Sequence, residues 1–305
     1  MRAEETKPPD PLVAPPGAAE EFTAALEAAS GRGHEVDWTD PMDGPQIKRA
    51  FDELLLADRP DRALDILVRS GVMQDLLPDA AALVGFGEGV RHKDVWEHTK
   101  RVVRQTPPRR DVRWAALLHD IGKVPTRRFE NGGQVTFIGH PEVGARMFDR
   151  IARRIPFDDD SRERIRFLIA AHLRASAYDR SWTDSAVRRF ARDAGEALDD
   201  LLDLSRADIT SKYSEKVRRG LHQIDELAER VAQIREQDAT PPPLPTGLGA
   251  AIIDQLGVAP GPALGRLMNR LKDEVEAGRL RAQQEYEHYL EFIRSVPDLL
   301  RRRGK

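Results

Sequence analysis

R-H-K-D-V-W-E-H-T at residues 91–99 and A-A-L-L-H-D-I-G-K at residues 115–123 are two stretches in which ligand-type side chains coincide with helical patterning. In the first, Val95, His98 and Val102 recur at helical spacing, so we expect His98 on the buried side of an amphipathic helix. A single histidine on such a face is more often a hydrogen-bonded core residue than a metal ligand. The interpretation of His98 therefore depends on the residues that accompany it.

The second stretch predicts an apolar helix from Trp114 to Ile121, which Gly122 brings to an end. His119 and Asp120 are adjacent near the end of this helix. Since adjacent side chains on a helix of 3.6 residues per turn point about 100° apart, the two converge only on something large or off-axis, such as a metal ion. A buried aspartate without such a partner is energetically costly.

Three later residues extend this set of metal-ligand types. His140 lies in F-I-G-H-P-E-V-G-A, His172 in L-I-A-A-H-L-R and Asp208 in L-S-R-A-D-I-T. The apolar residues before His172 and Asp208 have helical spacing, which directs both side chains toward the interior. The histidines are also concentrated in this region, which holds five of the eight in the chain: His92, His98, His119, His140 and His172.

The order H…H-D…H…H…D resembles that of the HD superfamily of metal-dependent phosphohydrolases. On this resemblance, four residues match the core metal ligands of the superfamily: His98, His119, Asp120 and Asp208. More narrowly, D-V-W-E-H-T, A-A-L-L-H-D-I-G-K, G-H-P-E-V-G-A and S-R-A-D are similar to the HD region of bacterial class II tRNA nucleotidyltransferases, the CCA-adding enzymes and their poly(A) polymerase relatives. The resemblance implies an all-α fold, an HD-domain helical bundle with flanking helical body and tail segments.

The likeness covers most of the chain. Residues 47–78 resemble the helical neck and body that precede the HD region in those enzymes, and residues 243–271 resemble their tail. The catalytic head of those enzymes carries a Gly-Gly-x-x-Arg-Asp signature and an Asp-x-Asp metal pair, and neither precedes the neck segment here. We therefore expect the neck, body, HD and tail portions without a head, and no nucleotidyl transfer.

Composition limits the alternatives. The 305 residues include 48 basic and 51 acidic side chains, a net charge of −3, and the length fits about two domains or one elongated helical domain. Cysteine is absent, so a metal site has only histidine and carboxylate as strong ligands. No run approaches the roughly 20 apolar residues of a membrane helix, and M-R-A-E-E-T-K has no hydrophobic signal core, so we expect no membrane span and a cytoplasmic protein.

Breaks in the helical pattern predict four segments: a disordered leader with a short helix at 1–40, a neck and body at 41–90, the HD domain at 91–240 and a tail at 241–305. The leader itself is residues 1–16, and the short helix is residues 18–29. N-G-G at residues 131–133, between two β-prone runs, predicts one short β-hairpin. P-P-P-L-P at residues 241–245 predicts a stiff extended linker before the tail.

The resemblance implies a divalent metal ion held by the four matched residues. If His140 and His172 bind a second ion, Asp120 is the ligand that the two ions share. Mixed imidazole and carboxylate ligands suit Mn, Fe, Co, Ni or Zn, and Mg is also compatible. Whether the site holds one ion or two stays open at this point.

Four further side chains are candidates for contact with a phosphate substrate: His92, Lys123, Arg146 and Arg174. Lys123, one turn after Asp120, is placed to neutralise the phosphate, and we take these two residues as the catalytic candidates. The alternative for Lys123 is a surface lysine at a helix end. His92 fits substrate contact or simple packing.

The function expected is metal-dependent hydrolysis of a phosphomonoester or phosphodiester bond in a nucleotide or RNA-end substrate. The alternative is a non-catalytic RNA- or tRNA-binding module, or the headless half of a split tRNA nucleotidyltransferase. The complete ligand set favours hydrolysis, since a module that only binds RNA does not need its buried histidines and aspartates. R-R-R-G-K at the C-terminus is a candidate for RNA contact through the tail, although an exposed charged terminus is the commoner case.

Overall fold

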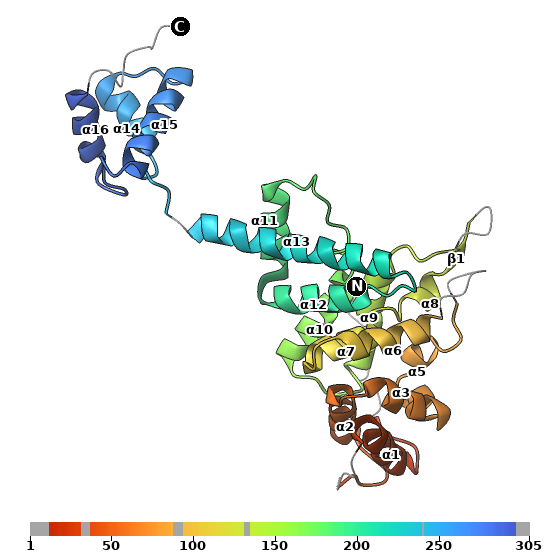
Figure 1. Ribbon diagram of the computed structural model, residues 1–305. Coiled ribbons are helices and arrows are strands. Elements are labelled where there is room, and N and C mark those ends of the chain that lie inside the picture. Colours follow the sequence, from red (N-terminus) through yellow and green to blue (C-terminus); the bar gives the residue numbers. More distant parts are fainter. Residues whose placement is uncertain (1–11, 32–36, 88–93, 131–134, 240, 297–305) are drawn as a thin grey trace, which may run out of the picture. The chain divides into compact units, whose positions relative to one another are not determined.

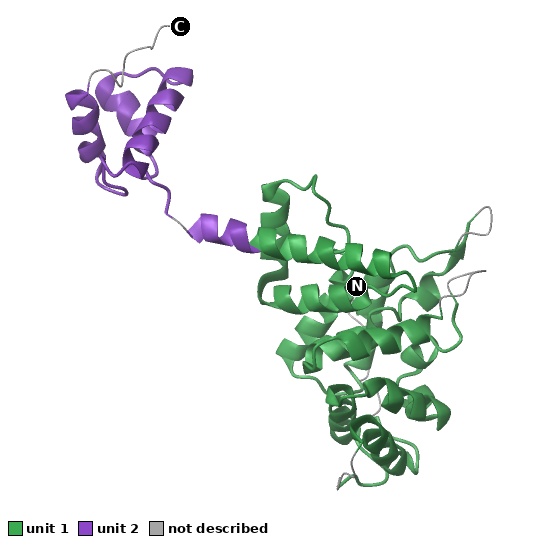
Figure 2. Ribbon diagram, viewed as in Figure 1, with its two compact units in different colours: residues 1–231 green, residues 232–305 purple. Residues whose placement is uncertain are grey.

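The computed structural model describes residues 12–31, 37–87, 94–130, 135–239 and 241–296 (Figure 1). Within these ranges the chain is helical apart from one two-stranded sheet, which confirms the predicted all-α class with a single hairpin. The chain divides into two compact units, residues 1–231 and 232–305 (Figure 2). No described helix combines the length and the apolar character that crossing a membrane requires. The segment boundaries expected at residues 40, 90 and 240 stay predictions.

The first unit begins with helices α1 to α5, which form the body. Asp43 and Gln46 form a capping box at the start of α2, and Pro60 begins α3, so local sequence sets both helix starts. The ring of Phe51 lies 5.2 Å from that of Phe22 and 5.4 Å from that of Trp114, which joins the body to the next layer. The helices are α1 (Ala18–Ser30), α2 (Gly44–Leu56), α3 (Pro60–Arg69), α4 (Val72–Leu76) and α5 (Pro78–Ala81).

The rest of the first unit surrounds one central helix, α7. Residues 114–118 of this helix are fully buried, and it packs against α2, α6, α10 and α12 (Figure 1). A helix that is apolar on all sides is stable only in such a setting. The helices of this part are α6 (Val95–Gln105), α7 (Arg110–Leu118), α8 (Lys123–Thr126), α9 (His140–Ile151), α10 (Asp159–Ala171), α11 (Asp184–Ala194) and α12 (Leu198–Asp208), with a 3₁₀ turn at Gly195–Ala197. Helix α13 (Ser214–Ala239) begins in this unit, and its residues from 232 onward belong to the second unit.

Aspartates begin two of the helices that carry site residues. Asp94 caps α6, its carboxylate accepting from the backbone N–H of Trp96 at 2.9 Å and of Glu97 at 3.2 Å. Asp158 caps α10 by accepting from the N–H of Ser161 at 2.8 Å. The run of three aspartates at residues 158–160 thus serves to start a helix.

The composition argument for a disordered leader is wrong for its last five residues. Leu12 and Ala14 are buried, and the backbone N–H of Ala14 donates to the carbonyl of Met42 at 2.9 Å. Two apolar side chains among prolines suffice to pack this segment onto the body. Residues 1–11 lie outside the described part.

The predicted hairpin is formed by β1 (Arg128–Phe129) and β2 (Val135–Thr136), which pair antiparallel with Arg128 opposite Thr136. The strands are shorter than the β-prone runs of the sequence. The N-G-G turn falls within residues 131–134, which are outside the described part.

The second unit contains α14 (Leu248–Leu256), α15 (Pro262–Glu276) and α16 (Tyr286–Ser295), so the predicted tail segment is helical. Its core includes Leu248, Ile252, Leu271, Tyr289 and Leu290, each fully buried. Residues 241–245 are not helical, as the proline run predicts. The basic run at residues 301–305 lies outside the described part.

Candidate metal centre

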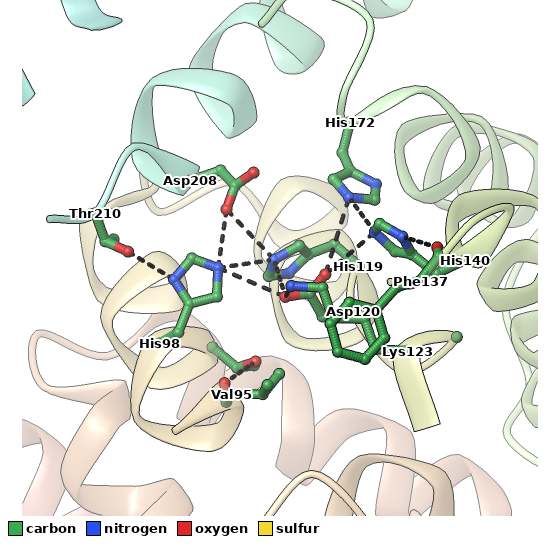
Figure 3. A network of polar contacts seen from close by, with 12 residues as sticks. Val95, His98, His119, Asp120, Lys123, Phe137, His140, His172, Asp208 and Thr210 are labelled. Carbon is green, nitrogen blue, oxygen red and sulfur yellow. Dashed lines mark hydrogen bonds and ion pairs between the residues drawn. The ribbon is translucent and has the colours of Figure 1, made fainter. Parts of the chain in front are cut away.

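The six ligand-type residues come together from five helices, mostly at helix ends (Figure 3). His119 follows the last residue of α7 and Asp120 comes next; Asp208 ends α12, His140 begins α9, and His172 follows α10, whereas His98 projects from the first half of α6. Helix ends can bring side chains from many directions to one point, which a set spread along a single helix face cannot do.

A close backbone approach at Gly122 brings α9 to the turn after Asp120. A methyl group at position 122 would lie 2.1 Å from the carbonyl oxygen of His140 and 2.7 Å from the backbone nitrogen of Gly144, distances that no side chain tolerates. The sequence interpretation of Gly122 as a helix stop was wrong. Helix α7 already ends at Leu118, and Gly122 has an ordinary right-handed φ of −66°. Glycine is needed at position 122 because any larger residue would collide with the backbone of α9.

The first ligand group consists of His98, His119 and Asp208, which we call the His98 group. Nε2 of His98 lies 3.3 Å from Nε2 of His119 and 2.9 Å from Oδ1 of Asp208. Nε2 of His119 lies 3.6 Å from the same oxygen. The three donor atoms therefore form a compact triangle.

The second ligand group consists of Asp120, His140 and His172, which we call the Asp120 group. Nε2 of His140 and Nε2 of His172 are 3.2 Å apart, and Oδ1 of Asp120 lies 3.5 Å from the first and 4.0 Å from the second. This group is deeply buried: the side chains of Asp120 and His172 are 2% and 1% exposed.

Asp120 belongs to both groups. Its Oδ1 faces His140 and His172, while its Oδ2 lies 3.2 Å from Nε2 of His119 and 3.6 Å from Nε2 of His98. One carboxylate thus presents an oxygen to each set of imidazoles (Figure 3). This is the arrangement of a carboxylate that is shared between two cations.

Each imidazole is held by its Nδ1 atom and turned so that Nε2 faces the cluster. Nδ1 of His119, His140 and His172 lies 2.8 to 2.9 Å from the backbone carbonyls of Ala116, Phe137 and Ile169. Because a carbonyl can only accept, the proton sits on Nδ1, and Nε2 is left with a lone pair in the neutral ring. Histidines that bind metals in proteins are oriented in this way.

Both carboxylates of the cluster are charged although they are largely buried. Burial acts to raise the pKa of Asp120, but the charge and hydrogen bond of His119 and the charge of Lys123 outweigh it and hold the pKa well below its usual value. Burial likewise acts against the Asp208 carboxylate, yet hydrogen bonds from His119 and His98 keep its pKa well below the usual value. Both carboxylates are therefore ionised at neutral pH.

The two carboxylates favour a protonated His119, whereas burial keeps His172 neutral. Burial disfavours the His119 imidazolium, but Asp120 and Asp208 more than offset this and raise its pKa to about 10. At His172, burial, reinforced by the nearby charge of His119, lowers the pKa to about 4. Burial also lowers the pKa of His140. The His98 group thus attracts a proton while His140 and His172 stay neutral.

These residues fit divalent metal ions. Ligand atoms that are about 2.0–2.2 Å from one ion lie roughly 3.0–3.4 Å from each other, close to most of the separations within the two groups. The neutral rings of His140 and His172 place two Nε2 lone pairs 3.2 Å apart, which is repulsive unless they share a cation. Oδ2 of Asp120 is buried and has two nitrogen atoms close to it, Nε2 of His119 at 3.2 Å and Nζ of Lys123 at 2.9 Å. Imidazole and carboxylate donors suit transition metals.

The structure places the four predicted substrate contacts differently. Nζ of Lys123 lies 2.9 Å from Oδ2 of Asp120, at the edge of the cluster. Arg146 is exposed, about 9 Å along α9 from His140. The guanidinium of Arg174 pairs with Asp193 at 3.0 Å and lies over the ring of Phe190. His92 is outside the described residues.

Thr210 is a further residue of the site, which the sequence motifs did not indicate. Its hydroxyl lies 2.7 Å from Nδ1 of His98 and takes the orienting role that carbonyls have for the other three histidines (Figure 3). The signal in the sequence is D-I-T, a hydroxyl residue two positions after the ligand Asp208. Such a partner is expected for any metal-binding imidazole, but its position in the sequence is not.

Comparison with known proteins identifies the class to which this centre belongs. A family model described as "HD domain" matches residues 92–213, the segment that contains all six residues of the two groups. The chain therefore carries an HD domain.

Curated relatives narrow the family. The chain is 33% identical over 255 residues to an A-adding tRNA nucleotidyltransferase of Deinococcus radiodurans and 31% identical over 259 residues to a CC-adding tRNA nucleotidyltransferase of Thermus thermophilus. These alignments cover 79% and 82% of this chain but 57% and 56% of the relatives, so the chain spans little more than half of their length. A multifunctional CCA protein of Pseudomonas paraeruginosa is 29% identical over 52% of this chain and 38% of its own length.

The chain is thus homologous over most of its length to bacterial tRNA nucleotidyltransferases. Both resemblances that the sequence motifs carried, to the HD superfamily and to these enzymes, are confirmed.

Proposed function

We propose that this protein hydrolyses phosphate esters at a two-ion centre formed by the His98 group and the Asp120 group. The observation that supports this most is Asp120, whose two oxygens face separate sets of imidazole nitrogens. A buried carboxylate in this position has little structural purpose without cations on both sides.

Divalent ions at such a centre supply Lewis acidity toward a water molecule and toward a phosphoryl oxygen. The residues of the chain contribute by holding the ligand atoms in position and by balancing charge. The Nδ1 hydrogen bonds keep the four imidazoles aimed at the centre, so little reorganisation is needed during the reaction. Asp120 and Asp208 balance the positive charge of the ions and keep them in place.

Lys123 is the group placed to bind the substrate phosphate. Its side chain is 12% exposed, against 2% for that of Asp120, so the ammonium group lies between the buried cluster and its surroundings. With divalent ions bound to Asp120, this ammonium group would pair with a phosphate oxygen of the substrate. Asp208, with a side chain that is 17% exposed, marks a second place where the cluster reaches the surface.

We propose a substrate from the chemistry of RNA ends: a nucleotide phosphate or the phosphate at the end of an RNA strand. The relatives act on tRNA according to their names, and the similarity extends well beyond residues 92–213. Ions of Mn, Fe, Co, Ni or Zn suit the ligands, with Mg also compatible.

The test is hydrolysis of a panel of nucleotide and RNA-end phosphates by protein reconstituted with each metal. We expect release of phosphate or opening of a cyclic phosphodiester by the wild type and its loss in Asp120→Ala. Asp193→Ala is the matched control, because this exposed carboxylate pairs with Arg174 and is not part of the cluster. Equal rates in the wild type and in Asp120→Ala would refute the proposal.

One observation favours a second function, tRNA binding without catalysis. The similarity to tRNA nucleotidyltransferases covers about four fifths of the chain, so it extends beyond the segment 92–213 that holds all six residues. On this alternative the protein binds tRNA and Asp120→Ala leaves the affinity unchanged, with no hydrolysis by either form.

A further inference from the structure

Alternating cations and aromatic rings lead away from the metal centre. Nζ of Lys123 lies 2.9 Å from Oδ2 of Asp120 and 5.6 Å from the centroid of the Phe137 ring, so this ring is within about 8.5 Å of the carboxylate. The Phe137 ring lies 6.1 Å from the Phe86 ring. The guanidinium of Arg127 then lies over two rings, at 4.9 Å from that of Phe86 and 4.8 Å from that of Phe129. We call Phe86, Arg127, Phe129 and Phe137 the aromatic–arginine strip.

The strip comes from two segments of the sequence, one before His98 and one between Asp120 and His140. Phe129 is in β1, Phe137 follows β2, and Phe86 precedes the segment that leads to α6. The hairpin extends from the first unit beside α8 (Figure 1). The carbonyl of Phe137 is also the acceptor for Nδ1 of His140, so the strip and the metal centre share a residue.

The outer end of the strip is apolar and exposed. Phe129 is 70% exposed, and Ile138, next to Phe137, is 78% exposed. Nε of Arg127 is buried and has no hydrogen-bond partner among the described residues. Folding does not account for these features, since exposed apolar groups gain nothing from burial and an unsatisfied N–H costs free energy.

A ligand in which flat rings alternate with negative charges fits this surface. Nucleobases stack on aromatic side chains and on arginine, and the phosphates between them are attracted to lysine and arginine. The strip offers four groups on which bases can stack, the rings of Phe86, Phe129 and Phe137 and the guanidinium of Arg127. A strand fits it better than a single nucleotide does.

We infer that the aromatic–arginine strip binds the unpaired bases of a single-stranded nucleic-acid end and so holds its terminal phosphate at the metal centre. The identity of the reacting group rests on the proposed function. The binding itself does not, because it can be measured in the absence of metal and of hydrolysis.

The experiment is fluorescence anisotropy with metal-free protein in EDTA and a labelled adenine RNA hexamer that carries a 3′-phosphate. We expect Phe129→Ala to weaken binding about tenfold, since one stacking platform is lost, and Phe129→Tyr to bind within about twofold of the wild type. Leu56→Ala is the control, because Leu56 is 39% exposed on α2 and belongs to neither the strip nor the cluster. It should bind as the wild type does.

The probes separate the alternatives. A hexamer with abasic sites in its last three positions, an RNA duplex of equal length and 3′-AMP should all bind the wild type at least tenfold more weakly than the hexamer. The inference is overturned if Phe129→Ala keeps wild-type affinity, if the wild type does not bind the hexamer, or if any of these three probes binds as tightly.

Hydrolysis of p-nitrophenyl phosphate by metal-loaded protein distinguishes this failure from failure of the proposed function. If Phe129→Ala loses hexamer binding and no form of the protein hydrolyses p-nitrophenyl phosphate, the role of the strip in binding is supported and the proposed function is refuted. If the protein hydrolyses p-nitrophenyl phosphate but Phe129→Ala binds the hexamer as the wild type does, only the role inferred for the strip is refuted.

Discussion

Replacing Gly122 with alanine tests how the chain builds its metal centre. The added methyl would lie 2.1 Å from the carbonyl oxygen of His140, more than 1 Å inside an ordinary contact, and both obstructing groups are backbone. Relief therefore requires the start of α9 to move. Overpacking of this kind costs about 3 kcal/mol of unfolding free energy, more than the roughly 1 kcal/mol that alanine gains over glycine in the chain.

Two other glycines give a graded comparison. A methyl at Gly144 would meet Cγ2 of Ile169 at 3.2 Å, a side-chain contact that can relax, so Gly144→Ala should cost about 1 kcal/mol or less. A methyl at Gly265 in α15 would meet nothing within 4 Å, so Gly265→Ala should be neutral or stabilising. The expected order of stability is Gly265→Ala, wild type, Gly144→Ala and then Gly122→Ala.

Urea denaturation followed by circular dichroism measures this order, and metal analysis measures its effect on the site. Because moving α9 moves His140 away from Asp120, Gly122→Ala should also bind fewer metal ions. Its rate of hydrolysis should fall about 100-fold, even at a low temperature at which the variant stays folded. If Gly122→Ala unfolds at the same urea concentration as Gly265→Ala and keeps its metal, the role assigned to the close approach is wrong.

Three further predictions follow from the centre and the sequence. Thr210→Val removes the partner of Nδ1 of His98 and should weaken metal binding by about 10- to 100-fold in a chelator competition, whereas Thr210→Ser should retain it. In the metal-free protein, the pKa of His119 is raised to about 10, so the stability that protonated His119 contributes should be lost as pH rises from 6.5 to 10. The pKa of His172 is lowered to about 4, so the folded protein should also lose stability as pH falls from 6.5 to 4. Urea midpoints measured across this range should therefore peak near pH 6.5, and a midpoint that rises steadily on either side would contradict these two shifts. Finally, this chain should not incorporate labelled CTP or ATP into tRNA, since it carries no Asp-x-Asp pair ahead of its neck segment, and incorporation by the pure protein would show that prediction to be wrong.

The all-α class with one hairpin could be predicted because the signals that form helices are local. Apolar spacing, the prolines that begin α3 and α9, and the aspartates that cap α6 and α10 act within one or two turns. Leu12 and Ala14 are the exception, since their burial depends on a body surface that composition does not describe.

The candidate site was predicted as a set of residues but not as a geometry. Spacing indicated that His98, His172 and Asp208 face inward, yet it could not show that Asp120 turns one oxygen to each ligand group. That depends on the approach of α9 at Gly122, a contact between segments about 20 residues apart. Thr210 and the aromatic–arginine strip were missed for the same reason, because their partners lie far away in the sequence.

Metal stoichiometry tests the central claim most directly. Purified protein, stripped with a chelator and reconstituted with excess Mn or Ni, should bind two ions per chain by elemental analysis. The double variant His140→Ala, His172→Ala should bind one, because the His98 group and Oδ2 of Asp120 remain. Circular dichroism serves as the control that this variant is folded. A wild-type maximum of one ion per chain would contradict the shared role of Asp120 and leave a single-ion HD site.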